Sequence, residues 1–158
     1  MDRVGTIIHT NDEIYRILGY QRKELIGQKI NKIQPRPVAS VHDTILKRFL
    51  VNYKDSNVLN NTRQLYAISA EGYLRPISIL IKLYPKISGQ ITMMAFMQLL
   101  SRIDGFDLFS LGNQDTIYQE LPHHLMITDA NGSIDCVTRG LFEEVGLSSK
   151  FFGRQESS

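Results

Sequence analysis

The chain is poor in two residue types, cysteine and tryptophan. Of its 158 residues, one is a cysteine, Cys136, and none is a tryptophan. A single cysteine excludes an intrachain disulfide and a cage of cysteines around a metal ion. The sequence therefore predicts a fold held together by an ordinary apolar core, in a reducing compartment.

An excess of charge of one sign is also missing. The 18 basic and 16 acidic residues are interspersed and leave a net charge of +2. The most basic stretch, Lys29–Arg36, is diluted by isoleucines and prolines, whereas binding to nucleic acid needs a one-sided basic face. Nucleic acid is therefore not an expected partner.

Long hydrophobic runs are absent as well. The stretch Ile91–Leu100 is interrupted by Thr92 and Gln98 and is too short to span a bilayer. The N-terminus does not resemble a secretory signal, because Met1-Asp2-Arg3 is followed by only a short apolar run. We expect this segment to make no direct membrane contact and to lie on the cytoplasmic side.

What the chain does have is an internal repeat. Its first twenty residues match a stretch near its end at a constant offset of 127 positions, the distance from Asp2 to Asp129. The shared pattern is Asp-x-x-Gly-x-Ile, then a polar cap and an apolar helix that ends in glycine. The matched residues are Asp2, Gly5, Ile7, Asn11, Tyr15, Leu18, Gly19 and Tyr20 with Asp129, Gly132, Ile134, Thr138, Phe142, Val145, Gly146 and Leu147. One unit therefore begins at the N-terminus and a second begins near residue 122.

Local patterns predict short helices followed by a sheet. A strand over Gly5–His9 precedes a short helix over Glu13–Leu18 that ends at a glycine suited to the left-handed conformation. A longer helix is predicted over Val38–Asn52 and is expected to lie on the sheet with one apolar stripe. The stripe consists of Val38, Val41, Ile45 and Phe49, with Leu46 beside them. Three alternating strands follow, over Thr62–Ala70, Tyr73–Tyr84 and Ile91–Leu100. The predicted fold class is α+β, with an antiparallel sheet, short helices and one longer helix packed on one face.

The order of these elements resembles a PAS domain. The residues that carry the likeness are Asn11–Tyr20 (NDEIYRILGY), Glu24–Gly27 (ELIG) and the hairpin from Glu71 to Ile77. The resemblance covers Gly5 to about Leu100, and again Leu121–Leu147 for the second copy. It implies a sensory or docking module within a larger signalling protein rather than an enzyme.

A second set of residues narrows the resemblance. Gln34-Pro35, His42-Asp43 and Phe49-Leu50 are similar to a signature of PAS units in large, mostly membrane-bound protist proteins of the "tiny macrocysts" type. Here Gln34 replaces the usual methionine, and the first outer strand is missing before Met1. By this resemblance, residues 1–101 form a PAS-like domain without its first strand, 102–121 a linker and 122–158 the beginning of a second, truncated unit. The expected partners are neighbouring domains of a membrane-anchored parent protein or a second copy.

Candidate chemical residues are few. PAS-like haem sensors bind iron through a histidine on the long helix, so the resemblance makes His42 a candidate haem ligand. We interpret His42 instead as a histidine near the helix start that bonds a nearby carbonyl. Flavin photochemistry would need an Asn-Cys-Arg motif, and Cys136 does not lie in one. His123 and His124 would point to opposite faces of a strand and cannot chelate one ion together. We therefore expect no catalytic residues, no metal site and no cofactor.

The two faces of the last two strands carry the remaining candidates. One face forms an ordinary core or, because methionine is flexible, leaves a pocket for a small apolar ligand. The candidate pocket residues are Ile45, Phe49, Ile79, Ile81, Met93 and Met97. On the other face, Met94 and Phe96 are large apolar side chains that a partner, or part of residues 106–111, is expected to cover.

Two functions remain open at this point. The first is a non-catalytic signalling module that works by protein contact, through dimerisation or docking on a neighbouring domain. The second is a small-molecule sensor, with haem as one candidate ligand, that binds between the long helix and the sheet. The missing strand also predicts a vacant slot beside Ile91–Leu100, filled by His124–Thr128 within the chain or across a dimer. Alternatively, the hairpin that contains His124–Thr128 packs at the edge of the domain.

Overall fold

The structure, a computed structural model, describes residues 1–51, 58–85, 91–100 and 124–146. The helices that precede the main sheet are α1 (Glu13–Leu18), α2 (Arg22–Leu25), the 3₁₀-helix η1 (Ile30–Ile33) and α3 (Arg36–Val51). The main sheet contains β1 (Thr62–Ile68), β2 (Leu74–Pro85) and β3 (Ile91–Leu99). The segment that carries the sequence repeat, called the second unit below, contains β4 (Met126–Thr128), β5 (Ile134–Val137) and α4 (Arg139–Val145). The predicted linker over 102–121, with the loop over 106–111, lies outside the described residues. The α+β fold class is confirmed.

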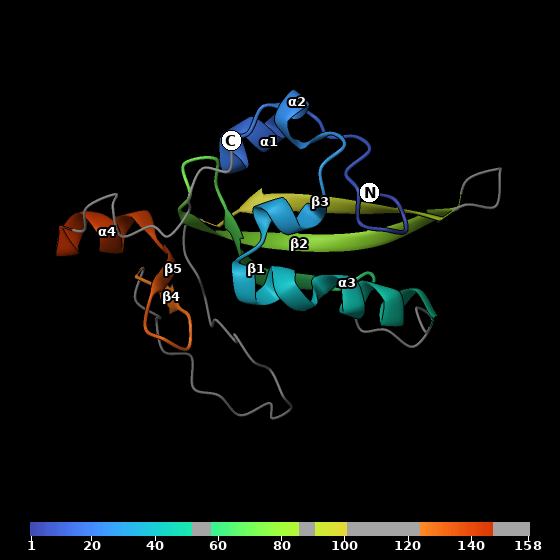
Figure 1. The fold of residues 1–158 in the computed structure, drawn as a ribbon. Helices are drawn as coiled ribbons and strands as arrows, with labels where there is room; N and C mark the ends of the chain where they lie inside the picture. The colour runs from blue at the N-terminus through green and yellow to red at the C-terminus, as the bar shows by residue number, and fades with distance from the viewer. Residues whose placement is uncertain (52–57, 86–90, 101–123, 147–158) are drawn as a thin grey trace.

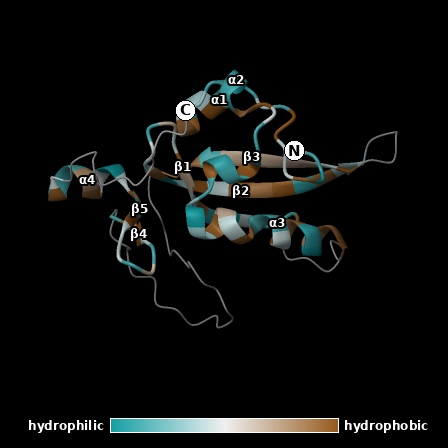
Figure 2. Ribbon diagram, viewed as in Figure 1, coloured by the Kyte–Doolittle hydropathy of each residue, from teal (hydrophilic) through white to brown (hydrophobic). Residues whose placement is uncertain are grey.

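The main sheet is antiparallel, with β2 between β1 and β3 (Figure 1). Its register places Ile77 opposite Leu99 and Ile79 opposite Met97, so the odd-numbered residues of β2 and β3 share one face. This is the alternation predicted from the sequence. Apolar residues follow one another along much of β2 (Figure 2), and Leu80 among them lies on the face opposite the core.

The core lies between the odd-numbered face of the sheet and the short helices. Its buried members are Ile7, Ile14, Leu18, Tyr20, Leu25, Ile33, Ala67 and Ile77. Two hydrogen bonds fix the end of α1 to the turn between β1 and β2. The Ala70 N–H donates to the Leu18 carbonyl at 2.8 Å, and the Tyr20 hydroxyl donates to the Ser69 carbonyl at 3.1 Å. This connection places α1 and α2 on the sheet and closes the core at that end.

The predicted orientation of the long helix α3 is wrong by part of a turn. Val38, Val41 and Ile45 are 45%, 49% and 50% exposed, whereas Leu46 is buried. Leu46 packs against the N-terminal turn so closely that a Cβ added to Gly5 would lie 3.3 Å from its Cδ2. The helix carries two overlapping apolar rows, and contact with this turn buries the row that contains Leu46.

The internal repeat extends to the geometry of its turn. The Asp2 Oδ1 accepts hydrogen bonds from the backbone N–H groups two and four positions later, at 3.0 and 2.8 Å. Asp129 Oδ1 accepts the equivalent pair, each at 2.9 Å. Gly5 and Gly132 occupy the same turn position, with φ of 81° and 80°, where a residue with a Cβ would be strained. The same local structure therefore forms at both ends of the 127-residue offset.

The hairpin of the second unit packs on the main sheet rather than completing it. Leu74, Tyr66 and Ile68 of the sheet form one buried cluster with Cys136 of β5. β4 pairs antiparallel with β5, and none of its described residues pairs with β3. The prediction that residues 124–128 fill a slot beside β3 within the chain is therefore wrong. Figure 1 shows the hairpin at the end of the sheet where β1 and β2 are joined.

Candidate functional site

The outer face of the main sheet, the face turned away from the core, has a covered end and an open end. The covered end is the cluster with the second unit's hairpin. The open end is formed by side chains on the even-numbered positions of the three strands, because successive side chains alternate between faces. Its residues are Thr62, Ser78, Leu80, Lys82, Tyr84, Met94, Phe96 and Gln98.

Large apolar side chains are exposed at the open end. Met94 and Phe96 are 43% and 48% exposed, and Tyr84 is similarly exposed. The prediction that Met94 and Phe96 lie on the face opposite the core is confirmed by the strand register. The contribution of Tyr84 was not predicted, although extending the same two-residue alternation along β2 would have identified it.

A shallow hollow of about 300 Å³ lies beside Phe96. It is lined by Thr62, Ser78, Leu80, Phe96, Met97 and Gln98. Thr62 pairs with Leu80, and Leu80 pairs with Phe96, so three strands contribute neighbouring side chains to this hollow. The Lys82 Nζ lies 5.9 Å from the centre of the Phe96 ring, a distance at which the cation is attracted by the ring. The open end thus combines exposed apolar side chains, a shallow hollow and the ammonium group of Lys82.

At the covered end, the outer face packs against another segment of the same chain, the β4–β5 hairpin. Around the buried cluster, the Asp135 carboxylate accepts a hydrogen bond from the Arg36 backbone N–H at 3.2 Å and lies 3.0 Å from the Arg36 Nε. The rings of Tyr73 and Phe142 meet edge to face at 5.5 Å between centroids. An apolar centre surrounded by polar contacts is the usual composition of a protein–protein interface.

The candidate ligand pocket on the core face is only partly assembled. Ile79 and Met97 are cross-strand neighbours, Met93 is buried, and Ile81 and Phe49 are partly buried. Ile45, by contrast, is half exposed. Met97 packs against the main core cluster. Ligand binding by these six residues stays a prediction.

His42 lies on α3 with its Nδ1 buried and without a hydrogen-bond partner among the described residues. Burial lowers the pKa of the His42 imidazole, and the neighbouring Asp43 carboxylate opposes that shift. Asn31 Oδ1 and Gln34 Oε1, from η1 and the segment that follows it, are also buried without a described partner. His42 does not line the hollow beside Phe96, and haem binding by His42 stays a prediction.

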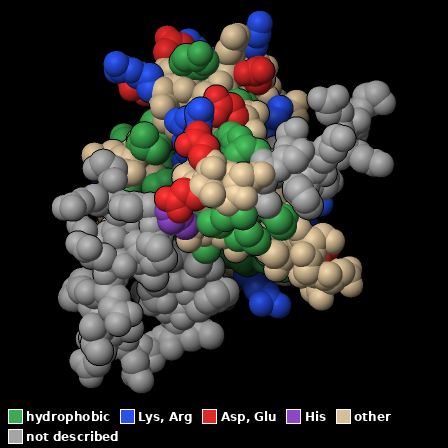
Figure 3. All heavy atoms as spheres, turned by 90° about the vertical axis from the view of Figure 1, so that its left-hand side faces the viewer, with side chains coloured by type: hydrophobic (Ala, Val, Ile, Leu, Met, Phe, Trp, Pro, Cys, Tyr) green, Lys and Arg blue, Asp and Glu red, His purple; other side chains and the backbone are tan. Residues whose placement is uncertain are grey.

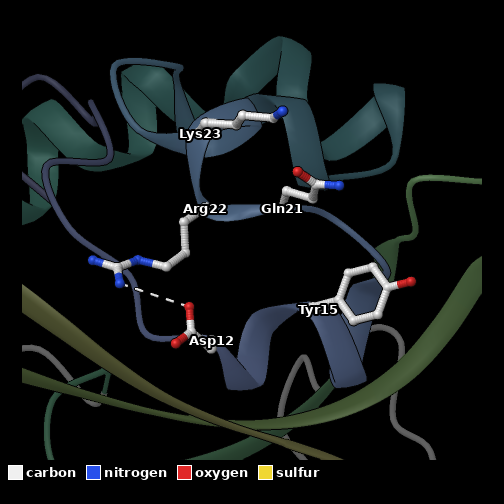
Figure 4. Close-up of a pocket in the computed structure, with 5 residues that line it drawn as sticks. All are labelled: Asp12, Tyr15, Gln21, Arg22 and Lys23. Carbon is white, nitrogen blue, oxygen red and sulfur yellow. Dashed lines mark ion pairs between the residues drawn. The ribbon is translucent and has the colours of Figure 1, made fainter.

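A second hollow lies between α1 and α2 and was not predicted from the sequence. It measures about 470 Å³ and is lined by Asp12, Tyr15, Gln21, Arg22 and Lys23. Figure 4 shows the Arg22 side chain turned toward Asp12, at 3.6 Å between Nη1 and Oδ1. Much of this lining is exposed to solvent, and its charges are mixed in sign. Figure 3 shows the same mixture over the upper part of the molecule, where α1 and α2 lie.

The described residues were compared with two further kinds of site, a metal-binding cluster and a membrane-spanning helix. No cluster of three or more His, Cys, Asp or Glu side chains in the described ranges could hold a metal ion. None of the helices in those ranges combines the length and hydrophobicity needed to cross a membrane.

Comparison with known proteins identifies the fold. A scan against models of protein families found no match, and a search of curated proteins found no significant match. Among solved structures, the PAS domain of a protein from Desulfitobacterium hafniense is similar, with a TM-score of 0.51 and 21% identity over 63% of this chain and 88% of that chain. The PAS domain of an HTR-like protein from Haloarcula marismortui covers the same share of this chain and 77% of its own, with a TM-score of 0.48 and 19% identity. The chain therefore has a PAS-like α+β fold.

Proposed function

We propose that this chain is a non-catalytic PAS signalling module that acts by protein contact, and that the open end of its outer sheet face binds a second copy. The observation that supports this most strongly is the exposure of Met94 and Phe96 on a face whose other end already holds a hairpin of the second unit. Exposed apolar side chains that are grouped on one face commonly mark an interaction site. A second copy bound at the open end would extend the cover that the hairpin provides at the other end.

The chemistry of the open end favours a protein partner over a small ligand. Methionine and aromatic side chains are enriched in protein interfaces, and the hollow beside Phe96 offers a place for one apolar side chain of the partner. The resemblance to units of membrane-bound protist proteins supports a position on the cytoplasmic side of a membrane-anchored parent. Contacts with neighbouring domains of that parent would use the same face.

Native mass spectrometry tests this proposal. We expect a species of twice the chain mass of 18.1 kDa, with no additional mass that denaturation removes. A monomer at every concentration would contradict the proposal. The measurement also separates protein contact from ligand binding, because it reports the oligomeric state and any bound small molecule in one spectrum.

A small-molecule sensor is the second candidate function. It is supported by the buried polar atoms of Asn31, Gln34 and His42 that lack described partners, because buried polar groups are normally hydrogen-bonded. A ligand that supplies hydrogen-bond donors at the junction of η1 and α3 would satisfy them. A mass excess lost on denaturation, or a haem or flavin absorbance band, would favour this function.

A further inference from the structure

The residues next to the start of α3 do not supply a side-chain cap for this helix. Pro35 has no side-chain oxygen, and the Gln34 Oε1 is buried without a hydrogen-bond partner among the described residues. The Val38 and Ala39 N–H groups donate to the Pro35 carbonyl, at 3.0 and 2.9 Å. The second residue of the helix is a proline and has no N–H. The remaining donor of the first turn is the Arg36 N–H, one of the groups for which a helix has no internal acceptor.

The second unit supplies the acceptor for this donor. Asp135 lies on β5, and its Oδ2 accepts the hydrogen bond from the Arg36 N–H at 3.2 Å. The Asp135 Oδ1 lies 3.0 Å from the Arg36 Nε. Aspartate is among the preferred capping residues, and a carboxylate at the start of a helix is also stabilised by the helix dipole. Figure 1 shows the β4–β5 hairpin beside the first turn of α3.

The Asp135 side chain depends on the same contact. It is 8% exposed, whereas the Arg36 side chain is 59% exposed. Removal of a carboxylate from water is costly unless hydrogen bonds and an opposite charge replace the water. Arg36 provides both, through its backbone N–H and its guanidinium group. Docking of the hairpin therefore requires the first turn of α3, and the same docking stabilises that turn.

The capped turn is also joined to the 3₁₀-helix η1. The Asn31 Nδ2 donates to the Ala39 carbonyl at 2.8 Å. The Asn31 Oδ1 is buried without a partner among the described residues, and so is the Nδ1 of His42, about one turn further along α3. Buried polar groups without partners lower the stability of the structure around them. The junction between η1 and α3 therefore gains from any contact that holds the first turn of α3 in place.

We propose that the second unit controls the start of α3 through a helix cap. With the β4–β5 hairpin docked on the outer face, Asp135 holds the first turn of α3 and its junction with η1 in place. Release of the hairpin removes the cap and loosens this turn. Coupling between two sites is reciprocal, so a change that loosens the η1–α3 junction weakens docking of the hairpin by the same factor. This communication takes place between two units of one chain and does not require a second copy.

Two rates measured on the full chain test the proposal. Cys136, the single cysteine, is buried in the cluster between the hairpin and the sheet. The rate of its reaction with a water-soluble thiol reagent therefore reports release of the hairpin. Amide hydrogen exchange at residues 39–42, followed by NMR, reports local opening at the start of α3. Exchange at residues 46–48 serves as the internal reference for the rest of the helix.

Removal of the cap is the first test. Asp135→Ala should speed exchange at residues 39–42 about fivefold, the usual effect of losing an N-cap, and should also speed the reaction of Cys136. Exchange at residues 46–48 should change less than twofold. Asp135→Asn keeps a capping oxygen and should have a smaller effect than Asp135→Ala. Unchanged exchange at residues 39–42 in Asp135→Ala would overturn the proposal.

Glu71→Ala is the matched control for the cap variant. It removes a second ion pair between the sheet and the second unit, that of Glu71 Oε2 with Arg139 Nη1 at 3.5 Å. Both side chains of this pair are exposed, and such pairs contribute little to stability. Since Glu71 does not contact α3 in this pair, both rates should stay within twofold of those of the unmodified chain.

Phe142→Ala weakens docking from the other side of the hairpin. It removes the edge-to-face contact with Tyr73 and leaves Asp135 in place. We expect faster reaction of Cys136 and faster exchange at residues 39–42. In the double variant with Asp135→Ala, it should add less than twofold to exchange at residues 39–42, because the cap is already lost. Faster reaction of Cys136 without faster exchange, or fully additive effects on exchange, would overturn the proposal.

A pair of glycine variants tests the coupling in the opposite direction. Ala39→Gly weakens the start of α3, and Lys47→Gly weakens its later part by a comparable amount, because glycine disfavours a helix about fivefold relative to alanine. We expect Cys136 to react at least threefold faster in Ala39→Gly and within twofold of the unmodified rate in Lys47→Gly. This pair decides the question if the Asp135 variants do not fold. Equal rates for Cys136 in the two glycine variants would overturn the proposal.

Discussion

Replacing Leu74 with alanine should destabilise the chain strongly, because the second unit's hairpin covers this side chain. Leu74 is 2% exposed and lies in the cluster with Cys136, on the outer face of β2. The change removes three carbon atoms, each worth about 0.8 kcal/mol on transfer from water, or about 2.4 kcal/mol together. The cavity left behind raises the expected loss to about 3–4 kcal/mol.

Leu80→Ala is the matched control for this prediction. Leu80 lies on the same strand and the same face, but at the open end and only partly buried, so its truncation should cost about 1 kcal/mol. Urea unfolding followed by circular dichroism and by the fluorescence of the seven tyrosines, in a chain without tryptophan, gives both values if the two signals coincide. Equal losses for Leu74→Ala and Leu80→Ala would refute the placement of the hairpin on this face.

Two further predictions concern α3. Ile45→Ala should lower the free energy of unfolding by at most about 1 kcal/mol, and Leu46→Ala by about 2–4 kcal/mol. If urea unfolding shows comparable losses of unfolding free energy for Ile45→Ala and Leu46→Ala, the orientation first predicted for α3 is correct. Burial lowers the pKa of the His42 imidazole in the folded chain, although the Asp43 carboxylate opposes this shift. At acidic pH the unfolded chain therefore binds more protons at this residue than the folded chain does. The free energy of unfolding should fall as the pH drops below about 6.5, the ordinary value for histidine, and through the lowered pKa. His42→Asn should reduce this acid-side loss in melting temperature. An unchanged pH profile in His42→Asn would contradict the assignment.

The three strands of the main sheet and their faces could be predicted from the sequence, because alternation along a strand is a local pattern. The strand predicted over Gly5–His9 was wrong, since that segment forms only an isolated bridge between Thr6 and Lys29. Ile77, Ile79 and Ile81 recur at every second position, with the polar residues Ser78 and Lys82 on the opposite face, and a shift of one residue would turn the isoleucines away from the core. The register found in the structure is therefore the one that the alternation demands. The placement of Met94 and Phe96 on the outer face followed from the same rule.

The orientation of α3 could not be predicted in the same way, because two apolar rows overlap on it. Ile45 and Leu46 are adjacent in sequence, and local spacing does not say which of them meets the rest of the fold. The choice depends on the contact between Leu46 and the N-terminal turn at Gly5, which is distant in sequence. Similarly, packing of the β4–β5 hairpin on Leu74 is a tertiary contact that no local pattern encodes.

The candidate site was predicted only in part, because some of it depends on contacts between residues that are distant in sequence. Met94 and Phe96 are conspicuous as large apolar residues on a face expected to be polar. The hollow beside Phe96 and the covered end of the same face arise from cross-strand and inter-unit contacts, which the sequence does not display. Ile45 was assigned to a core-face pocket only through the helix orientation that proved wrong.

The mass of the chain in solution, measured by sedimentation over about 1–100 µM, a range typical of weak association, tests the central claim most directly. The variant is Met94→Glu with Phe96→Glu; glutamate is chosen because Lys82 lies directly opposite position 94 and would form a favourable pair. The control is Val38→Glu with Val41→Glu, an equal charge change at similarly exposed apolar positions of α3. We expect the unmodified chain and the control to dimerise, and the Met94/Phe96 variant to remain folded and monomeric. A Met94/Phe96 variant that dimerises as well as the unmodified chain, or a control that alone loses association, would contradict the assignment of the outer sheet face as the contact surface.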